Sequence, residues 1–429
     1  MATPHFETLA LHAGHTVDSE TLSRGVPVYR TSSYLFKSAE HAANLFSLKE
    51  PGNIYSRLMN PTQDVLEQRV AALEGGAAAL AVSSGTSAIF YTMINICDHG
   101  DEVVAANNLY GGTYTQFDTI LPKFGIKVHM VDPRDPARFE QAVTDKTRVL
   151  YCETIGNPGL EMTDIEAVAA IAAKHHLPLV VDSTFTPPCL FRPLEHGADI
   201  VIHSLTKWMG GHGVALGGIV VDSGRFDWTD PKFTLYNEPD PGYHGLRYAH
   251  DLGDMNPIAF ALRMRLVALR NLGACTTPDN CWYFLQGLET LALRMERHCS
   301  NALAVAEFLQ AHKDVDWVAY PGLTPKDSAA KKYLKNGFGG MVAFGVKGGR
   351  AAGQRFIESL CLFSHLANVG DAKSLAIHPA STTHSQLNRE QLAAAGLSDR
   401  MIRLSVGIEY IDDIIEDLDR ALQASINAE

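Results

Sequence analysis

Short apolar runs alternate with longer segments of helical pattern through the central part of the chain, residues 61–286. Apolar runs occur at residues 80–82, 179–181 and 198–203, and each is followed by small or polar residues. Runs of this length are typical of strands buried on both faces of a sheet. Residues 165–175 have instead the spacing of an amphipathic helix. The alternation predicts an α/β fold with a mostly parallel sheet of the seven-stranded type, flanked by helices.

The segments on either side of this region have different patterns. Residues 1–60 are turn-rich and lack an apolar core of their own, so we expect an intersubunit arm rather than a domain. After residue 286 the pattern predicts a long helix, two strands and a closing helix, at residues 287–310, 340–346, 401–407 and 411–424. We therefore expect an arm (1–60), a large domain (61–286) and a smaller C-terminal α+β domain (287–429).

Composition restricts the classes of function. The 429 residues carry a net charge of −12, which argues against nucleic acid or an anionic membrane as a partner. There is no apolar run long enough to span a membrane, and residues 1–7 lack the pattern of a signal peptide, so we expect a cytoplasmic protein. The histidines and cysteines lack metal-ligand spacing, so we expect no metal. We expect buried thiols at Cys97, Cys152 and Cys361, and partly exposed ones at Cys275, Cys281 and Cys299.

A lysine follows the apolar run 198–203 and is flanked by two hydroxyl residues. Ser204, Thr206 and Lys207 precede the glycine-rich segment 210–213. A lysine at a strand end can bind the aldehyde of pyridoxal 5′-phosphate (PLP) covalently, and the hydroxyls can bind its phosphate. The alternative is a surface lysine before a glycine turn, because lysines rarely lie buried without a partner or a chemical task.

An aspartate ends the apolar run 179–181. Asp182 precedes Lys207 by about one strand and one connection, so the two strand ends could face one site. A carboxylate beside the ring nitrogen of PLP keeps that nitrogen protonated, which PLP needs as an electron sink. The alternative is that Asp182 only caps the next turn or helix.

The apolar run 80–82 leads into a turn of small residues and then a helical pattern. Gly85 and Thr86 would lie at the start of that helix, where backbone N–H groups and the helix dipole favour a phosphate. The segment has neither a Walker lysine nor a G-x-G-x-x-G pattern, so it does not favour a nucleotide.

Taken in order, these segments resemble the cysteine/methionine-metabolism family of fold type I PLP-dependent transferases. The resemblance extends from about residue 55 to residue 409, nearly the whole chain. Five further motifs carry it: Tyr55-Ser56-Arg57, Tyr110-Gly111-Gly112, Glu153-x-x-x-Asn157-Pro158, Lys373-Ser374-Leu375 and Arg403-Leu404-Ser405. Thr86 stands where the family commonly has methionine, but a contact through the backbone N–H does not depend on that side chain.

The resemblance implies a role for each motif. Tyr110 stacks on the PLP ring, Asn157 binds the ring hydroxyl and contacts substrate, and Arg403 binds the substrate carboxylate with help from Ser374. Tyr55 and Arg57 reach the cofactor phosphate of a neighbouring subunit, and Tyr55 also contacts substrate and assists proton transfer. The catalytic residues would then be Lys207, Asp182, Tyr55 and Tyr110, in a homotetramer built as a dimer of dimers with shared active sites.

Details within the family favour one reaction. The tyrosine motif continues with Gly112, where methionine γ-lyases typically carry cysteine. The loop 370–374 and an insertion at 224–276 also resemble the O-acetylhomoserine sulfhydrylases. This implies γ-replacement on O-acetyl-L-homoserine by sulfide or methanethiol, giving L-homocysteine or methionine and acetate. A γ-lyase or cystathionine γ-synthase reaction on the same scaffold stays open. A catalytically silent binding protein is the other alternative, although silence would relax both Lys207 and Asp182.

Overall fold

The computed structural model describes residues 4–326, 328–382 and 398–426. Its larger sheet has the strand order β1-β7-β6-β5-β4-β2-β3. In chain order the strands are β1 Ala78–Val82, β2 Glu102–Ala106, β3 Lys127–Val131, β4 Thr147–Glu153, β5 Leu179–Asp182, β6 Ile200–Ser204 and β7 Gly218–Asp222. Only β7 runs antiparallel to its neighbours, β1 and β6. The prediction of a mostly parallel, seven-stranded sheet is confirmed.

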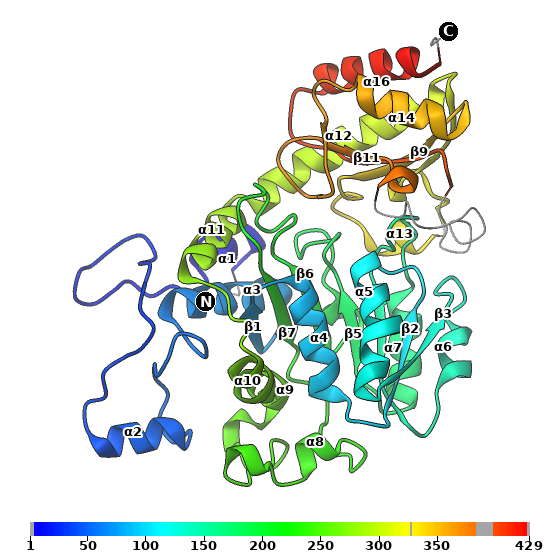
Figure 1. Ribbon diagram of the computed structural model, residues 1–429. Coiled ribbons are helices and arrows are strands. Elements are labelled where there is room, and N and C mark those ends of the chain that lie inside the picture. The colour runs from blue at the N-terminus through cyan, green and yellow to red at the C-terminus, as the bar shows by residue number, and fades with distance from the viewer. Residues whose placement is uncertain (1–3, 327, 383–397, 427–429) are drawn as a thin grey trace.

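Helices flank this sheet (Figure 1). Helix α3 packs against β1 and β7, α4 against β6 and β7, and α7 against β4 and β5. The helices of this part are α3 Pro61–Glu74, α4 Gly85–Ile96, α5 Gly111–Thr115, α6 Ala137–Ala142, α7 Ile165–Lys174, α8 Thr234–Asn237, α9 Ala259–Arg263, α10 Arg270–Leu272 and α11 Pro278–Glu289. Capping fits these boundaries: Asn60 accepts a hydrogen bond from the Thr62 N–H and precedes a proline at the first position of α3.

A second sheet and its helices form the upper part of Figure 1. The strand order is β10-β11-β12-β9-β8, with β8 Val315–Ala319, β9 Met341–Val346, β10 Ser364–His365, β11 Leu375–Ile377 and β12 Met401–Ser405. The accompanying helices are α12 Leu291–Ala311, α13 Ala329–Tyr333, α14 Gly349–Ser359 and α16 Ile411–Ile426. Leu309, Phe344, Phe356 and Leu418 belong to a separate apolar core in this part. The domain boundaries after residues 60 and 286 stay predictions.

The expected helix at residues 287–310 is interrupted. Helix α11 ends at Glu289 and α12 begins at Leu291, because Thr290 adopts φ −114° and ψ 11°, outside helical geometry. The strands expected near residues 340–346 and 401–407, and the closing helix, are β9, β12 and α16. Three thiol expectations were wrong: Cys361 is exposed, whereas Cys281 and Cys299 are buried. Local apolar neighbours do not reveal which face of an element meets the core.

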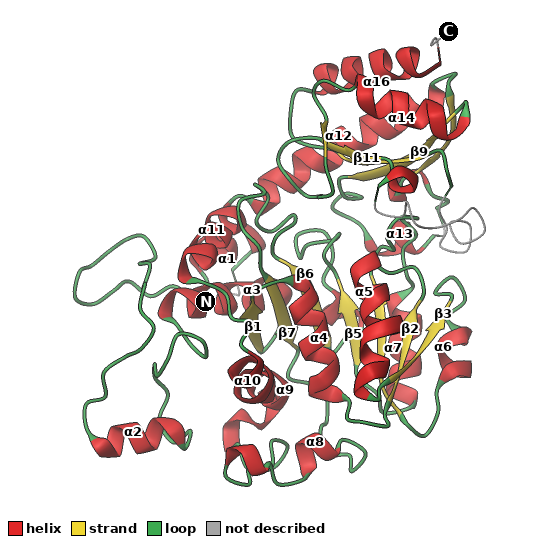
Figure 2. Cartoon of the chain, viewed as in Figure 1, coloured by secondary structure: helices red, strands yellow, loops and turns green. Residues whose placement is uncertain are grey.

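The N-terminal segment is mostly loop (Figure 2). Helix α1, Phe6–His12, packs against α3 and α11. Helix α2, Ala39–Phe46, lies apart from the sheet at the lower left of the view. Of the segment predicted as an arm (1–60), residues 17–58 follow α1, and from here on the name arm refers to these residues. In the part of the chain that the structure describes, no helix is long and apolar enough to cross a membrane.

Candidate active site

The carboxyl ends of six strands, β1 to β6, lie at one edge of the large sheet. Glu153 at the end of β4 pairs in register with Asp182 at the end of β5, and Asp182 pairs with Ile202 on β6. Parallel strands place their terminal side chains at one edge, where ligands of open α/β sheets bind. The ends of β5 and β6, which carry Asp182 and lead to Lys207, thereby lie side by side, as the sequence predicts.

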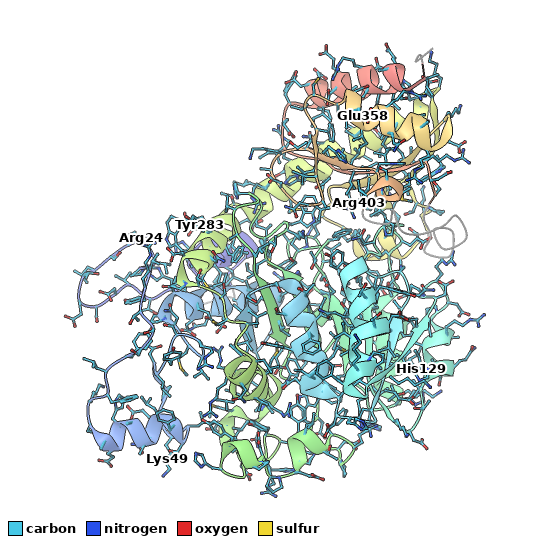
Figure 3. The ribbon with its side chains drawn as sticks, in the orientation of Figure 1. Arg24, Lys49, His129, Tyr283, Glu358 and Arg403 are labelled. Atoms are coloured by element: carbon cyan, nitrogen blue, oxygen red, sulfur yellow. The ribbon has the colours of Figure 1, made fainter. Side chains whose placement is uncertain are left out.

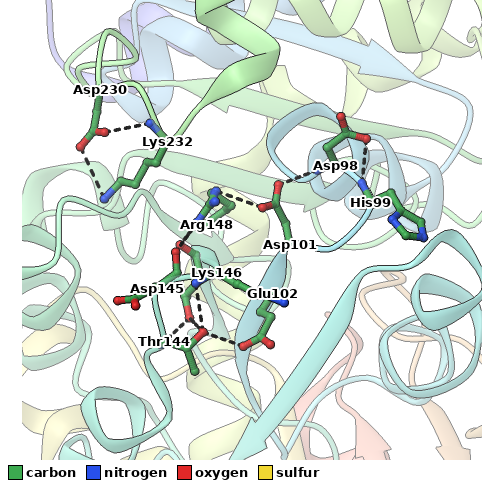
Figure 4. Close-up of polar contacts among 11 residues, drawn as sticks. Asp98, His99, Asp101, Glu102, Thr144, Asp145, Lys146, Arg148, Asp230 and Lys232 are labelled. Atoms are coloured by element: carbon green, nitrogen blue, oxygen red, sulfur yellow. Dashed lines mark hydrogen bonds and ion pairs between the residues drawn. The ribbon is translucent and has the colours of Figure 1, made fainter.

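The opposite edge of the sheet also carries charged side chains, but these pair with one another (Figure 4). Arg148 Nε lies 3.1 Å from Asp101 Oδ1, and the Thr144 hydroxyl donates to Glu102 Oε2 at 2.7 Å. In the described residues, no group of three or more His, Cys, Asp or Glu side chains could hold a metal ion. The carboxyl edge is therefore the candidate site.

Lys207 lies in a tight turn that directly follows β6. Its Nζ donates a hydrogen bond of 2.5 Å to Asn368 Oδ1. Burial, and secondarily the positive charge of Arg403, lowers the pKa of Lys207 to about 8. An amine with this pKa is much more available as a neutral nucleophile or base than an exposed lysine.

Asn368 is a functional candidate that the sequence analysis missed. It lies 161 residues from Lys207 in the chain, and only its nearness to the loop 370–374 could have drawn attention to it. Gly370, at φ +78°, lets this loop approach, since a Cβ there would lie 2.6 Å from the Trp208 backbone nitrogen.

Two carboxylates lie side by side at the strand ends. Asp182 Oδ1 accepts from the Thr184 N–H at 2.9 Å, and burial raises the pKa of Asp182. Burial first, and the Asp182 charge second, raise the pKa of Glu153 well above its usual range. Glu153 Oε1 also accepts from the Tyr110 N–H at 2.7 Å. A cationic group beside this pair would stabilise its ionised form. Glu153 thus positions Tyr110, a role that its motif alone did not reveal.

The first turn of α4 offers backbone N–H groups. Ser84 Oγ accepts from the Ser87 N–H at 3.1 Å, which caps the third residue of the helix. The N–H groups of Gly85 and Thr86 precede it and belong to the set that no helical carbonyl can reach. A Cβ at Gly85 would lie 2.9 Å from Ser204 Cβ, so only glycine lets α4 approach the end of β6 this closely. Thr206 Oγ1 accepts from the Gly217 N–H at 3.1 Å.

A further group of predicted residues meets beside this edge. Arg403 on β12, labelled in Figure 3, donates from Nη1 to Asn157 Oδ1 at 2.9 Å. Burial lowers the pKa of Arg403 to about 10, so it remains a cation at neutral pH. The Tyr110 side chain is 49% exposed and hence open to a stacking partner. The small sheet thus supplies a cation to the edge of the large one.

The hydroxyl of Ser374, which precedes β11, is engaged by the loop that follows β12. Ser374 Oγ donates to Glu409 Oε2 at 2.9 Å and accepts from the Gly407 N–H at 2.9 Å. The Ser374 N–H also donates to Glu409, at 2.6 Å. Contact between Ser374 and substrate stays a prediction. What the structure shows is a serine that orders the loop after β12.

Tyr55 and Arg57 lie in the arm. Arg57 Nη1 donates to the Arg270 carbonyl at 2.7 Å, and its guanidinium lies 5.4 Å from the centre of the Tyr55 ring. Within the described residues, no hydrogen bond joins either side chain to Lys207 or Asp182. Their predicted place at a neighbouring subunit's phosphate is not tested by a single chain.

The edge fits PLP on chemical grounds. Lys207 offers a readily deprotonated amine, and Asp182 a half-buried carboxylate for a protonated ring nitrogen. The start of α4 offers N–H donors for a phosphate. It packs closely against β7, since a Cβ at Gly218 would lie 2.2 Å from the Ser84 carbonyl oxygen. Lysine, carboxylate and anion-binding turn are all at one edge.

Comparison with known proteins agrees with this fit. The family described as Cys/Met metabolism PLP-dependent enzyme matches residues 7–423. The chain is 56% identical to the O-acetyl-L-homoserine sulfhydrylase of Leptospira meyeri, over 97% of this chain and 96% of that protein. It is 50% identical to the homocysteine synthase of Schizosaccharomyces pombe, over 98% and 99% of the two chains.

A solved structure is similar as well. The O-acetylhomoserine (thiol)-lyase structure from Campylobacter jejuni superimposes with a TM-score of 0.93 at 42% identity, covering 97% of this chain and 99% of that one. That structure carries N′-pyridoxyl-lysine-5′-monophosphate, a lysine joined to PLP. The chain described above therefore belongs to the Cys/Met metabolism family of PLP-dependent enzymes.

Proposed function

We propose that this PLP-dependent enzyme replaces the acetoxy group at the γ-carbon of O-acetyl-L-homoserine with sulfide, releasing acetate and forming L-homocysteine. With methanethiol as the sulfur donor the product is methionine. The observation that carries the proposal is the meeting of Lys207, Asp182 and the Arg403–Asn157 pair at one sheet edge. The relatives with nearly full-length matches, named as sulfhydrylases and a homocysteine synthase, support the choice of substrate.

PLP, when bound, supplies the electron sink that makes removal of the substrate α-proton possible. The chain must hold it at five places: the aldehyde carbon, the ring nitrogen, the ring hydroxyl, the phosphate and the ring face. Lys207 anchors its aldehyde carbon, Asp182 stays ionised to hold the proton on the ring nitrogen, and Asn157 binds the ring hydroxyl. Gly85, Thr86, Ser204 and Thr206 bind the phosphate, and Tyr110 packs on the ring face with its backbone held by Glu153.

Arg403 binds the α-carboxylate of the substrate. Its guanidinium is oriented by Asn157 and offers a planar fork of donors that matches a carboxylate. Ser374 supports this contact through the order that it gives the loop after β12. The contact between Arg403 and the carboxylate orients the α-carbon of the substrate toward the Lys207 amine.

Lys207 moves protons once the substrate amine has displaced it. The neutral amine accepts the α-proton, and its lowered pKa, about 8, keeps a useful fraction unprotonated near neutral pH. Asn368 holds Nζ by accepting its hydrogen bond. Tyr55 assists proton transfer at the γ-carbon side, where acetate leaves and the sulfur nucleophile adds.

The site is completed by a second subunit in this proposal. The arm bonds Arg57 to the Arg270 carbonyl of its own chain and exposes apolar side chains, which supports an arm that reaches a partner. A partner that receives the arm would gain the Arg57 cation for its phosphate. We propose a homotetramer built as a dimer of dimers, working in the cytoplasm.

A substrate matrix tests the function. The purified enzyme is assayed with O-acetyl- and O-succinylhomoserine, each with sulfide, methanethiol, cysteine or no thiol. We expect the highest kcat/KM for the acetyl ester with sulfide or methanethiol, with homocysteine or methionine as product. Release of 2-oxobutanoate at the same rate without thiol would assign a γ-lyase instead, and preference for cysteine would assign a cystathionine γ-synthase.

A further inference from the structure

The turn that carries Lys207 has an unusual backbone hydrogen-bond arrangement. The Gly210 N–H donates to the Leu205 carbonyl at 2.9 Å, and the Gly211 N–H donates to the Lys207 carbonyl at 2.7 Å. The carbonyls of Trp208 and Met209 lie between these in the chain, and no backbone N–H of the described residues donates to either. Both residues are buried, so both carbonyls need a partner other than water.

The partner is a single side chain on another element. Arg294, in the first turn of α12, donates from Nη1 to the Trp208 carbonyl at 2.8 Å and from Nη2 to the Met209 carbonyl at 3.2 Å. Nη2 also donates to the Gly287 carbonyl on α11, at 2.7 Å. One guanidinium therefore joins the lysine turn to both helices at the α11–α12 break.

Arg294 is buried, with 6% of its surface exposed. None of the ion pairs found among the described residues includes it, so its charge is balanced by carbonyl dipoles. Burial lowers the pKa of Arg294 to about 10, which leaves it protonated at neutral pH. A buried cation is costly without such partners, so its presence needs a reason.

The surrounding backbone leaves room for the guanidinium. A Cβ at Gly211, where φ is +69°, would lie 2.1 Å from Arg294 Nη1. A Cβ at Gly287 would lie 2.5 Å from the carbonyl oxygens of both Met209 and Gly210. Two glycines thus let the lysine turn, α11 and the guanidinium meet at close range.

We propose that Arg294 is a positioning residue: by capping the Trp208 and Met209 carbonyls it fixes the turn that carries Lys207, and so the place of Nζ at the cofactor. This rests on the proposed role of Lys207 as the PLP-bearing lysine. Arg294 does not touch the reacting atoms. A small displacement of a reacting group lowers a rate strongly, so a support of this kind matters to turnover.

The test compares Arg294→Met and Arg294→Lys with Arg263→Met. Arg263 is a matched control, because it is 7% exposed and also donates to carbonyls, those of Leu235 and Asn95. Four properties are measured for each protein. They are the thermal midpoint, the PLP dissociation constant of the apoprotein, the pH titration of the lysine-bound PLP absorbance, and kcat and KM for the ester.

We expect Arg294→Met to lower kcat by about 10²-fold, with KM for the ester changed little. It should also weaken PLP binding and shift the pH midpoint of the visible band. The kcat of Arg294→Lys should lie between those of the unaltered enzyme and Arg294→Met. Millimolar guanidinium should restore part of the kcat of Arg294→Met. Arg263→Met should lower the thermal midpoint comparably but leave kcat and the band unchanged.

Equal changes in kcat for Arg294→Met and Arg263→Met would overturn the proposal, since Arg294 would then act on stability alone. If Arg294→Met does not fold, Arg294→Lys decides, and a folded Arg294→Lys with normal kcat, PLP affinity and band titration is contrary to it. Absence of a lysine-bound PLP band in the unaltered enzyme, with Lys207→Ala identical to it, would instead refute the proposed function.

Discussion

At the carboxyl edge of the large sheet, polar side chains stand on strands that are otherwise buried, whereas in the arm apolar side chains stand in solvent. Val180 and Val181, next to Asp182, are fully buried. In the arm, Leu35 is 97% exposed and Leu22 is 73% exposed. These exposed leucines support the proposal that the arm packs against a partner subunit.

The two regions are also held differently. Asp182 and Lys207 are fixed by the strand ladder, by Asn368 and by Arg294. The arm contacts the rest of its chain through single bonds to several elements. Thr62 on α3 bonds Pro27 and Tyr29, and Arg30 pairs with Asp279 on α11. The insertion 224–276 adds bonds from Tyr243 to Phe46 and between Arg57 and Arg270. The strand edge is therefore held within buried elements, whereas the arm is held by separate bonds along its length. An active site that combines the strand edge with a partner's arm would depend on subunit assembly only for the residues that the arm supplies.

The largest effect is expected at the centre of the strand edge. Lys207→Ala removes the amine that we propose as the PLP anchor, so turnover should fall by about 10³-fold or more. The visible absorbance of lysine-bound PLP should disappear at the same time. Absorbance spectra and steady-state assays on the same preparation measure both. A Lys207→Ala enzyme with ordinary turnover would contradict the assignment.

Asp182→Asn should have the next largest effect. The substitution keeps the shape and the acceptor for the Thr184 N–H but removes the charge beside the ring nitrogen. We expect PLP to remain bound through its phosphate and lysine contacts, while kcat falls about 10²- to 10³-fold. Bound PLP is quantified by absorbance after denaturation. Nearly unchanged kcat would exclude Asp182 as the ring-nitrogen partner.

The residues at the carboxyl edge could be predicted from the sequence because the patterns that indicate them are local. A lysine and an aspartate directly after apolar runs, and small residues before a helical pattern, follow from strand and helix chemistry without any long-range information. Parallel strands then bring such ends together. The fold class followed from the same alternation.

Other features depend on contacts between distant segments. Asn368 bonds Lys207 across 161 residues, and Arg294 bonds the lysine turn across 86. Neither residue lies in a pattern that differs from an ordinary loop or helix. The hydrogen bond from Ser374 to Glu409 and the helix break at Thr290 are likewise set by packing and backbone geometry. Local pattern indicates which groups do chemistry, but not which groups hold them.

The pH dependence of covalent PLP binding tests whether burial lowers the pKa of Lys207. Burial and Arg403 favour the neutral amine of Lys207, with a pKa of about 8. As the pH falls below about 8 the amine becomes protonated, and the rate at which apoprotein binds PLP covalently should fall about tenfold per pH unit. Stopped-flow absorbance follows the reaction. A pH midpoint near the ordinary pKa of lysine would mean that water reaches the Lys207 amine in solution.

Subunit mixing tests whether the arm serves a partner. Arg57→Ala and Lys207→Ala subunits are each expected to be nearly inactive, yet their mixture should regain about one quarter of full activity. Half of the randomly formed dimers are mixed, and one of the two sites in each combines an intact Lys207 with an intact Arg57. Subunit exchange is checked by mass-tagged chains. Exchange without any return of activity would place Arg57 at its own chain's site.

The smallest effect is expected where the insertion holds the arm. The Tyr243 hydroxyl donates to the Phe46 carbonyl at 2.9 Å, at the end of α2, and Phe46 is half exposed. Tyr243→Phe removes this one bond and leaves the ring, so local opening of the arm should become easier by about 0.5–1.5 kcal/mol. Trypsin cleavage near Lys49 should then accelerate about two- to tenfold under dilute conditions.

The matched control is Tyr410→Phe, which removes an exposed hydroxyl outside the arm and should leave cleavage near Lys49 unchanged. The thermal midpoint should stay the same in both variants, since the sheet cores are untouched. An unchanged cleavage rate for Tyr243→Phe would mean that other contacts, such as those of Arg57 and Arg265, hold the arm without the Tyr243 bond. Faster cleavage with unchanged turnover at high enzyme concentration would show that the partner subunit, once bound, outweighs the insertion in fixing the arm.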